Sequence, residues 1–340
     1  MNHILAIESS CDDSGLAVFS PTEGIVYERT QSQLDLHRHY GGVVPGLAAR
    51  EHLHHIPLLL KDLQGQYDLS NIDRLAVTLG PGLAGSLSMG IQAAQALAVA
   101  LQKPLSGVHH LRGHLFSAWI PFFEKNSSTF RSRCGDFLPQ LALLVSGGNT
   151  LLVQIDATLD IQTLAATVDD AAGEAFDKGA KLLGLPYPGG PEIEKNARNA
   201  NPDTYSFPKA FPHPEEKKFS FSGLKTSLRY LLEKIPEETF NAQIFDLCAS
   251  YQQTIVETLI HKTRQLLYEK IFSSLALSGG VAQNNLLRNE MQKLAQECSI
   301  PLYLPHPRHS GDNAAMIAFA AFMDPTHTSA DVILNPSWEL

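Results

Sequence analysis

Residues 141–150 read Leu-Ala-Leu-Leu-Val-Ser-Gly-Gly-Asn-Thr, and this stretch indicates both a fold class and a ligand. Its apolar run has the length of a buried strand, and Gly147-Gly148 follows directly after Ser146. Ser278-Gly279-Gly280 repeats the pattern after Leu275–Leu277, and Gly189-Gly190 forms a third pair. Glycines at strand ends let backbone N–H groups approach a phosphate, and a following helix adds a favourable dipole. A single pair is more often an ordinary turn, but the three pairs together predict nucleotide contact.

The rest of the chain alternates short apolar runs with helical segments, which predicts a layered α/β structure. The expected strands are 4–7, 16–19, 75–78, 105–108, 141–145, 151–155 and 275–277. The expected helices are 47–63, 85–101, 111–119, 172–183, 223–234, 239–270, 284–297 and 312–323. Residues 121–139, polar and bounded by prolines, form the expected boundary between two lobes. A weak likeness between residues 5–10 and 143–148 suggests an internal duplication with a cleft between the halves.

Composition narrows the class of protein. Hydrophobic residues make up 44% and charged residues 18% of the 340 residues, as in ordinary folded proteins. The net charge of −9 argues against a broad basic face, so any nucleic-acid substrate needs a local basic patch or a partner. The four cysteines form no CxxC pair, which fits a reducing compartment. The sequence shows no secretion signal, and its longest apolar stretch, 93–101, is short for a bilayer span. We therefore expect a cytoplasmic protein without membrane contact.

His110-Leu-Arg-Gly-His114 is the candidate metal motif. The two imidazoles lie four residues apart, on one face of a predicted helix, and Asp312 offers a third ligand. Two polar surface histidines remain an equal alternative, because the chain has 14 histidines. Leu111 stands where an HExxH peptidase has its glutamate base, so that chemistry is excluded. The rival cluster at 51–55 lies on a helix that looks like a solvated face, and it ranks lower.

Acidic residues mark three further positions. Glu8, Asp12 and Asp13 follow the first strand and could orient a metal-bound or water-mediated phosphate, although an Asx turn explains the two aspartates equally well. Asp169-Asp170 is expected to cap a helix N-terminus. Asp177, one short helix before Tyr187-Pro-Gly-Gly, is the better candidate for a ribose hydroxyl.

The irregular stretch 199–222 contains prolines at 202, 208, 212 and 214 and is expected to be functional. Basic residues gather there and just beyond it, at Lys209, Lys217, Lys218, Lys225 and Arg229. They form the local patch suited to RNA phosphates, with a solvated surface loop as an equal alternative.

The ordered series of motifs resembles one family closely. The matching segments are Glu8-Ser-Ser-Cys-Asp12, Tyr40-Gly-Gly-Val-Val-Pro45, Gly80-Pro-Gly82, His109-His-Leu-Arg-Gly-His114, Val145-Ser-Gly-Gly148, Asp169-Asp-Ala-Ala-Gly-Glu-Ala-Phe-Asp-Lys178, Lys181-Leu-Leu-Gly-Leu185, Tyr187-Pro-Gly-Gly-Pro191, Phe219-Ser-Phe-Ser-Gly-Leu-Lys-Thr226, Ser278-Gly-Gly-Val281 and Asp312-Asn-Ala-Ala-Met-Ile-Ala318. Together they look like the tRNA N6-adenosine threonylcarbamoyltransferase family, in its bacterial branch. The resemblance extends over nearly the whole chain.

The resemblance implies a two-lobed actin/sugar-kinase-like fold, a duplicated ribonuclease-H-like topology with a nucleotide cleft between the lobes. Lobe I would span 1–128 with 308–340 returning to it, and lobe II would span 136–307. The implied reaction transfers the threonylcarbamoyl group from threonylcarbamoyl-AMP to N6 of adenosine 37 in tRNAs that read codons beginning with adenine. AMP is the released product.

The resemblance also implies ligands and partners. His110, His114 and Asp312 match the metal ligands, with iron as the expected metal and zinc as the alternative. The nucleotide substrate would contact Val145, Ser146, Gly147, Gly148, Asn149, Asp177, Gly190, Glu194 and Asn284. An inactive paralogue as dimer partner and a small P-loop ATPase are the implied protein partners. Glu8, Asp12 and Asp13 are the candidates for the general base.

Three positions depart from the family pattern. Asn149 replaces a histidine, Ser310-Gly311 replaces Cys-Thr, and Asp13 replaces a glutamate. Asn149 donates a hydrogen bond but carries no proton at neutral pH, which puts any metal or proton-transfer role of that histidine in doubt. Two rival functions share parts of the pattern. A sugar-kinase-type enzyme would have little need for the two histidines, and a catalytically dead paralogue would lack them.

Overall fold

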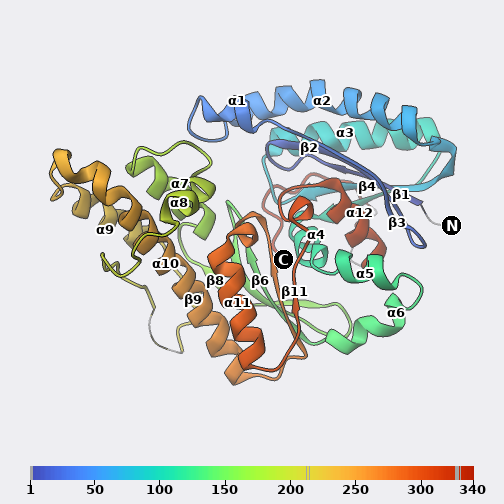
Figure 1. The fold of residues 1–340 in the computed structure, drawn as a ribbon. Coiled ribbons are helices and arrows are strands. Elements are labelled where there is room, and N and C mark those ends of the chain that lie inside the picture. Colours follow the sequence, from blue (N-terminus) through green and yellow to red (C-terminus); the bar gives the residue numbers. More distant parts are fainter. Residues whose placement is uncertain (1–2, 212, 214, 326–328, 330) are drawn as a thin grey trace. The chain divides into compact units, whose positions relative to one another are not determined.

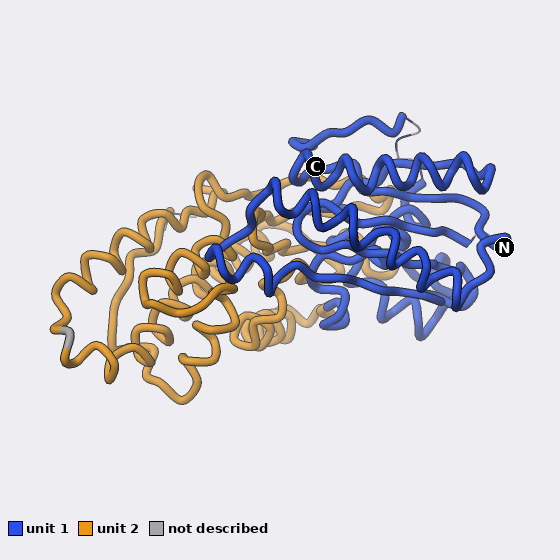
Figure 2. The backbone as a smooth tube through the Cα atoms, turned by 90° about the horizontal axis from the view of Figure 1, so that it is seen from above, with its two compact units in different colours: residues 1–135, 304–340 blue, residues 136–303 orange. Residues whose placement is uncertain are grey.

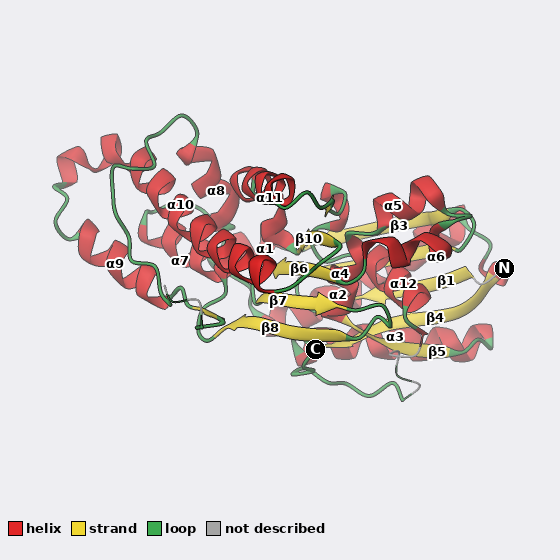
Figure 3. Ribbon diagram, turned by 90° about the horizontal axis from the view of Figure 1, so that it is seen from below, coloured by secondary structure: helices red, strands yellow, loops and turns green. Residues whose placement is uncertain are grey.

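The chain forms two compact units. A computed structural model describes residues 3–211, 213, 215–325, 329 and 331–340. Unit 1 comprises Met1–Gly135 and Leu304–Leu340, and unit 2 comprises Asp136–Tyr303 (Figure 2). Each unit has its own mixed sheet with helices packed on it (Figure 3). The C-terminal segment thus returns to the unit that contains the N-terminus.

Unit 1 contains a five-stranded sheet in the order β3-β2-β1-β4-β5, and Figure 1 labels its strands β1 to β4. Its strands are β1 (His3–Glu8), β2 (Asp13–Ser20), β3 (Gly24–Ser32), β4 (Ile72–Gly80) and β5 (Leu105–His109). Its helices are α1 (Leu34–Arg38), α2 (Pro45–Gln66), α3 (Ala84–Leu101), α4 (His110–Ser117), α5 (Ile120–Asn126), α6 (Phe130–Arg133) and α12 (Ala314–Met323), with short 3₁₀ turns at Leu69–Asn71 and Pro307–His309. β1 pairs antiparallel with β2 and parallel with β4.

The alternation of side chains along β1 decides what each face of this sheet meets. Leu5 and Ile7 join a buried cluster with residues of α2 and α3. Ile4 is paired with Phe19, whose ring lies 5.6 Å from that of Phe319 in α12. Glu8 shares the face of Ile4, because their positions differ by an even number. The strand therefore ends with a carboxylate on the side of the sheet that α12 covers.

Unit 2 repeats the topology of unit 1. Its sheet has the order β11-β10-β6-β7-β8-β9, and β6 pairs antiparallel with β7 and parallel with β10. The strands are β6 (Gln140–Val145), β7 (Thr150–Ile155), β8 (Ile161–Thr167), β9 (Lys218–Phe219), β10 (Ser274–Ser278) and β11 (Leu302–Tyr303). The helices are α7 (Ala172–Leu182), α8 (Gly189–Ala197), α9 (Ser222–Leu232), α10 (Glu237–Glu269) and α11 (Asn285–Glu297), with 3₁₀ turns at Cys134–Phe137 and Gly280–Gln283. The order β8-β7-β6-β10-β11 matches β3-β2-β1-β4-β5, so the expected internal duplication is confirmed by topology.

All the strands and helices expected from the sequence are present, and several others were missed. The missed strands are β3, β8, β9 and β11, and the missed helices are α1, α5, α6 and α8. β3 and β8 carry many exposed polar residues, so their apolar pattern is weak, and β9 and β11 contain two residues each. Helices α11 and α12 begin after Asn284 and Asn313, whose side chains cap them. Pro57 lies inside α2.

Helix α3 corrects the expectation that no apolar stretch approaches the length of a bilayer span. Ala84–Leu101 is, by length and composition alone, sufficient to cross a membrane. In unit 1 it packs against α2 and β4, and Leu87 and Ile91 join the core. Core helices of folded domains meet the same length and composition criteria, and the face of α3 that carries Leu87 and Ile91 is buried in unit 1.

Candidate metal and nucleotide sites

The metal motif sits where β5 passes directly into α4. His109 ends the strand and caps the helix, because its Nδ1 accepts a hydrogen bond from the Leu111 N–H at 3.1 Å. Burial lowers the pKa of His109 to about 4, so the ring is neutral and Nδ1 is free to accept. Its ring centroid lies 4.7 Å from that of Trp338 in the C-terminal segment. The start of α4 is thus held from the sheet and from the C-terminal tail.

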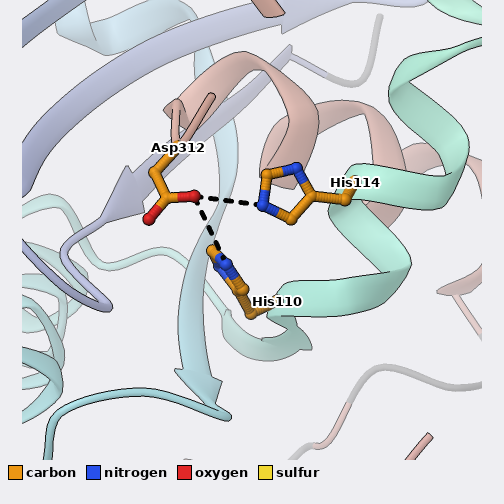
Figure 4. Close-up of side chains that lie close together, drawn as sticks. All are labelled: His110, His114 and Asp312. Carbon is orange, nitrogen blue, oxygen red and sulfur yellow. Dashed lines mark hydrogen bonds and ion pairs between the residues drawn. The ribbon is translucent and has the colours of Figure 1, made fainter. Parts of the chain in front are cut away.

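His110, His114 and Asp312 converge as the sequence predicted (Figure 4). His114 Nε2 lies 3.0 Å and His110 Nε2 lies 3.5 Å from Asp312 Oδ1. The candidate ligand atoms of the three residues all lie within 4.8 Å of one another. Both histidines are buried, and α12 begins just after Asp312 and packs on α4. Two imidazoles and one carboxylate form the donor set of a facial triad, which suits Fe²⁺ and also Zn²⁺.

Electrostatics bind the three side chains together without a metal. Burial alone would lower the pKa of His110, but the carboxylates of Asp312 and Glu8 raise it to about 9. Burial alone would raise the pKa of Asp312, but His110 and His114 hold it well below its usual range. A divalent cation would take the place of the shared protons, as is usual at sites that couple metal binding to proton release.

Glu8 lies behind this group and is fully buried. Its Oε2 lies 3.2 Å from His110 Nδ1 and accepts a hydrogen bond from Thr78 Oγ1 at 2.5 Å. Burial alone would raise the pKa of Glu8, but His110 and its hydrogen bonds lower it. Glu8 therefore contacts a candidate ligand rather than open space.

Asp12 and Asp13 follow at the β1–β2 turn. Burial raises the pKa of both carboxyl groups, and for Asp13 the nearby charge of Asp312 adds to the effect and brings the value to about 7. Asp13 Oδ1 is buried and has no hydrogen-bond partner among the described residues. Of the three acidic candidates, Asp13 is thus the one whose pKa is raised to about 7.

The rival histidine cluster on α2 has a structural explanation. His52 is buried, which corrects the expectation of a solvated face. Its Nδ1 lies 2.7 Å from Ser14 Oγ and its Nε2 lies 3.0 Å from the Cys11 carbonyl, so both ring nitrogens are occupied. His55 pairs with Glu51 at 3.7 Å. Within the described residues, the only cluster of potential metal ligands is the group at His110, His114 and Asp312.

The glycine-rich turns of unit 2 surround a pocket of about 280 Å³, here called the glycine pocket. It is lined by Gly147, Gly173, Phe176, Asp177, Tyr187, Pro188, Gly190, Pro191, Glu194, Gly280, Val281, Gln283 and Asn284. Gly279 has a φ of +88°, and a Cβ there would lie 2.3 Å from the Val145 carbonyl oxygen. Glycine is therefore required where the β6 and β10 turns meet, and backbone rather than side chain forms that part of the pocket.

The structure separates the predicted nucleotide residues into two groups. Gly147, Asp177, Gly190, Glu194 and Asn284 line the glycine pocket. The remaining predicted residues, Val145, Ser146, Gly148 and Asn149, belong to the end of β6 and the β6–β7 turn and are not among the lining residues. That turn is closed by a hydrogen bond from the Ser146 N–H to the Asn149 carbonyl at 2.8 Å.

Some of the lining groups already have partners. Asp177 Oδ1 accepts the Gly189 N–H at 2.7 Å, Glu194 Oε1 accepts the Asn285 N–H at 2.9 Å, and Asn284 Nδ2 donates to Gln252 Oε1 at 2.8 Å. These contacts fix the three side chains around the pocket. Sequence reasoning missed Phe176 and Tyr187, the two aromatic rings of the lining, although both lie inside motifs that it had singled out.

A larger hollow of about 520 Å³ runs along α10, away from the glycine turns. Its charged side chains pair with one another or with backbone, as Lys209 does with Glu257 and Lys262 does with the carbonyls of His213 and Glu216. Its lining includes no glycine and no aromatic residue. The glycine pocket is therefore the better candidate for a nucleotide, despite its smaller volume.

The expected helix cap at Asp169-Asp170 is wrong. The residue that precedes α7 is Ala171, and no side chain caps the helix. Asp169 Oδ1 instead accepts the Phe221 N–H at 2.8 Å, and its Oδ2 accepts the hydroxyls of Ser220 and Ser222. Asp170 pairs with Lys178 at 2.6 Å. Asp169 thus anchors the start of α9, a long-range contact that local helix-capping rules cannot reveal.

The predicted basic patch is less continuous than the sequence suggests. Lys209 pairs with Glu257, Lys217 pairs with Glu269 at 2.6 Å and Arg229 lies 3.8 Å from Glu233, so three of its five cations have a carboxylate partner. Residues 212 and 214 lie outside the described part of the chain. Lys218, Lys225 and Arg229 lie on or just before α9, and Lys234 lies just after it. We call Lys218, Lys225, Arg229 and Lys234 the α9 basic group.

Comparison with solved structures defines the class first. The chain is similar to HypF from T. kodakarensis, with a TM-score of 0.61 and 16% identity over 95% of this chain and 48% of that one. It is also similar to component A of (R)-2-hydroxyglutaryl-CoA dehydratase from Acidaminococcus fermentans, with a TM-score of 0.53 and 11% identity over 95% and 99%. At these identities the likeness concerns the fold alone, and it confirms the actin/sugar-kinase-like α/β fold.

Sequence relatives are more specific. A family model described as tRNA N6-adenosine threonylcarbamoyltransferase matches residues 24–319. The enzyme of that name from Dichelobacter nodosus is 44% identical over 344 residues, covering 99% of this chain and 96% of the relative. The one from Anaeromyxobacter sp. strain Fw109-5 is 43% identical, covering 99% of both. The chain therefore belongs to the tRNA N6-adenosine threonylcarbamoyltransferase family and is a transferase that modifies tRNA.

Proposed function

We propose that this enzyme transfers the threonylcarbamoyl group from threonylcarbamoyl-AMP to N6 of adenosine 37 in tRNAs that read codons beginning with adenine. Family membership supports the reaction class, and the group His110, His114 and Asp312 is the observation that carries the proposal. A sugar-kinase-type enzyme does not need these imidazoles, and a dead paralogue lacks them. The direct test measures transfer of label from threonylcarbamoyl-AMP to such a tRNA, with and without the partner proteins. Phosphorylation of a small molecule from ATP would instead favour the sugar-kinase-type enzyme.

The glycine pocket would hold the adenosine part of the donor. Phe176 and Tyr187 would offer aromatic rings for the base, and the carboxylate of Asp177, which also lines the pocket, would accept a hydrogen bond from a ribose hydroxyl. The backbone N–H groups of the glycine turns, including Gly147-Gly148 and Gly279-Gly280, would bind the phosphate and stabilise the charge that grows on AMP as it leaves. Unit 2 would then serve as the nucleotide lobe and unit 1 as the metal lobe.

His110, His114 and Asp312 would hold one divalent metal. Their donor set fits Fe²⁺ best, with Zn²⁺ as the alternative. When bound, such an ion supplies Lewis-acid polarisation of substrate oxygens. The protein itself would orient the N6 amine so that its lone pair attacks the carbamoyl carbon while the bond from that carbon to the AMP oxygen breaks. The proton lost from N6 needs an acceptor, and we propose Asp13, because its buried Oδ1 has no hydrogen-bond partner among the described residues and burial raises its pKa to about 7.

Replacement of Asn149 by histidine tests whether the family's histidine takes part in the chemistry. Asn149 closes the β6–β7 turn through backbone groups, which a histidine would retain. We therefore expect Asn149→Ala and Asn149→His to fold alike, and Asn149→His to change turnover by less than about tenfold, or about 1.4 kcal/mol in the barrier. Steady-state transfer rates decide the matter. A gain of several orders of magnitude would show that this chain is impaired or performs another reaction.

The RNA substrate would meet the α9 basic group. Helix α9 packs on α7, and α7 contributes Gly173, Phe176 and Asp177 to the glycine pocket. A surface hollow of about 410 Å³ lies along α9 and is lined by Ser206, Gly223, Thr226, Ser227, Tyr230, Leu231 and Lys234. The Tyr230 ring is half exposed, and the Arg229 guanidinium lies 5.1 Å from its centroid. Aromatic faces beside cations suit unpaired bases and their phosphates.

Charge reversal of Lys225 should weaken tRNA binding and leave affinity for the nucleotide donor unchanged. The slope of log K against log salt should become shallower by about 0.7 for each phosphate that the protein no longer neutralises, the value for single strands. Lys217→Glu is the matched control, because the Glu269 carboxylate already neutralises Lys217, and its effect should be smaller. Fluorescence titration at several salt concentrations measures both quantities. Equal effects of the two changes would contradict the placement of RNA on α9.

Partner proteins would complete the RNA path. Because the chain carries a net charge of −9, we expect the isolated protein to bind tRNA only in the non-specific range of roughly 10⁻⁴–10⁻⁶ M at physiological salt. We propose an inactive paralogue as dimer partner and a small P-loop ATPase as a further subunit, on the basis of family membership. The four cysteines are free, which supports a reducing cytoplasm as the compartment.

A further inference from the structure

The carboxylate of Glu8 is surrounded by hydrogen-bond donors only. Its Oε1 accepts the backbone N–H of Ser10 at 2.5 Å. Its Oε2 accepts the Thr78 hydroxyl at 2.5 Å and lies 3.2 Å from His110 Nδ1. An ionised carboxylate has no hydrogen to donate, so the hydrogen between Glu8 and His110 belongs to Nδ1. Glu8 and Thr78 are both fully buried, which leaves no room for water to exchange these roles.

We propose that Glu8 is a positioning residue that keeps a proton on His110 Nδ1 and thereby reserves His110 Nε2 for the metal. This inference rests on the metal site proposed above and replaces the candidate role of Glu8 as a general base. A metal-binding imidazole needs one ring nitrogen without a proton, and its other N–H group is commonly held by a carboxylate. His110 Nε2 is the nitrogen that lies beside Asp312 Oδ1, at 3.5 Å.

The fold explains why the glutamate stands at this position. Glu8 ends β1 on the face that α12 covers, and Thr78 lies in the neighbouring strand β4. His114 provides a contrast, because its Nδ1 is buried and has no hydrogen-bond partner among the described residues. The carboxylate therefore acts on one of the two imidazoles, and its removal should affect His110 selectively.

Replacement of Glu8 by glutamine reverses one hydrogen bond while preserving the size of the side chain. The Ser10 N–H only donates, so the amide oxygen must stay beside it and the amide NH₂ group must occupy the place of Oε2. The Thr78 hydroxyl can rotate and accept from this group, whereas His110 Nδ1 can accept only by losing its proton. The neutral ring then keeps its single proton on Nε2, the nitrogen that the metal requires.

The experiment uses the full chain labelled with ¹⁵N and freed of metal. Long-range ¹H–¹⁵N spectra report whether His110 Nδ1 carries a proton, and calorimetric titration with Zn²⁺ reports affinity. We expect Glu8→Gln to remove the proton from Nδ1 and to lower zinc affinity by about 10–100-fold, as for other outer partners of metal ligands. Glu8→Asp keeps an acceptor and should retain the proton on Nδ1.

Glu28→Gln is the matched control, because Glu28 Oε2 bonds the buried His309 Nε2 at 2.7 Å in the same unit. It should leave the His110 spectrum and zinc affinity unchanged.

A protonated Nδ1 together with undiminished zinc affinity in Glu8→Gln would overturn the inference. The wild-type protein could bind neither zinc nor iron while Glu8→Gln still removes the proton from His110 Nδ1. That result would refute the metal proposal and leave intact the control of the His110 proton by Glu8. If Glu8→Gln does not fold, Thr78→Val is tested in its place. This change leaves the Glu8 carboxylate beside His110, so Nδ1 should keep its proton, and loss of that proton would count against the role of Glu8.

Discussion

His114→Ala is expected to abolish metal binding and threonylcarbamoyl transfer together while the protein stays folded. The variant removes one of three ligands, and since even outer partners change metal affinity 10–100-fold, we expect a loss of at least about 100-fold. His114 Nε2 is 3.0 Å from Asp312 Oδ1, so its loss also leaves a partly buried carboxylate with one fewer side-chain partner. Elemental analysis of the purified protein, a transfer assay and thermal unfolding measure the three consequences.

His54→Ala supplies the matched histidine control. His54 lies exposed on α2 within the rival histidine cluster, and its removal should change neither metal content nor activity. Full metal occupancy in His114→Ala would refute the site. Loss of metal in the His54 variant would instead point to the α2 cluster, even though both ring nitrogens of the neighbouring His52 are occupied by protein groups.

Asp13→Asn is expected to lower the transfer rate by about 10²–10⁴-fold, the usual contribution of a general base. In the wild-type protein, kcat/KM should rise with pH as Asp13 loses its proton. The plot of kcat/KM against pH should thus have a rising limb, and this limb should be absent for the variant. Asp13→Glu restores the residue that is usual in the family and should retain both the activity and the limb. An unchanged pH profile in Asp13→Asn would exclude Asp13 as the proton acceptor.

Stability provides a separate measurement on the same variant. Burial and the charge of Asp312 raise the pKa of Asp13 to about 7, above its value in the unfolded chain. The folded state thus binds more protons than the unfolded state from about pH 4 to 7, and the contribution of Asp13 to stability is lost as the pH rises through this range. Asparagine cannot ionise, so the metal-free Asp13→Asn variant does not lose this contribution. Its free energy of unfolding relative to that of the wild type should therefore increase as the pH rises through this range. Denaturant unfolding at pH 5 and pH 8 checks the sign.

Much of the fold could be predicted from local pattern. The apolar runs at 4–7 and 141–145 form strands of the sheet cores, and the motif at 110–114 places two histidines on one helix face because the helical repeat is local. Gly279 was predicted to bring backbone N–H groups close to a phosphate, and the structure adds that its φ of +88° and the nearby Val145 carbonyl require glycine there. Asn149 and the glycine turns could likewise be placed at strand ends from the sequence alone.

Contacts between distant segments were beyond the reach of such patterns. Asp169 looked like a helix cap, but it anchors the start of α9 more than 50 positions away. Lys217 looked like part of an RNA patch, but the fold brings Glu269 beside it. His52 looked solvated, but it is buried against Ser14. Each case depends on a partner that is remote in the chain, which composition and periodicity do not encode.

The sequence by itself determined the fold class, the family and the three candidate ligands, because these depend on residue type, spacing and motif order. The tertiary structure alone decided which groups surround those ligands, and the proposed proton on His110 Nδ1 follows from these neighbours. Glu8 lies 102 positions before His110, and only the pairing of β1 with β4 and the packing of α4 and α12 on that sheet bring its carboxylate to the Nδ1 atom. The chemistry of an imidazole depends on which nitrogen carries the proton, and that is set by neighbours in space rather than in sequence.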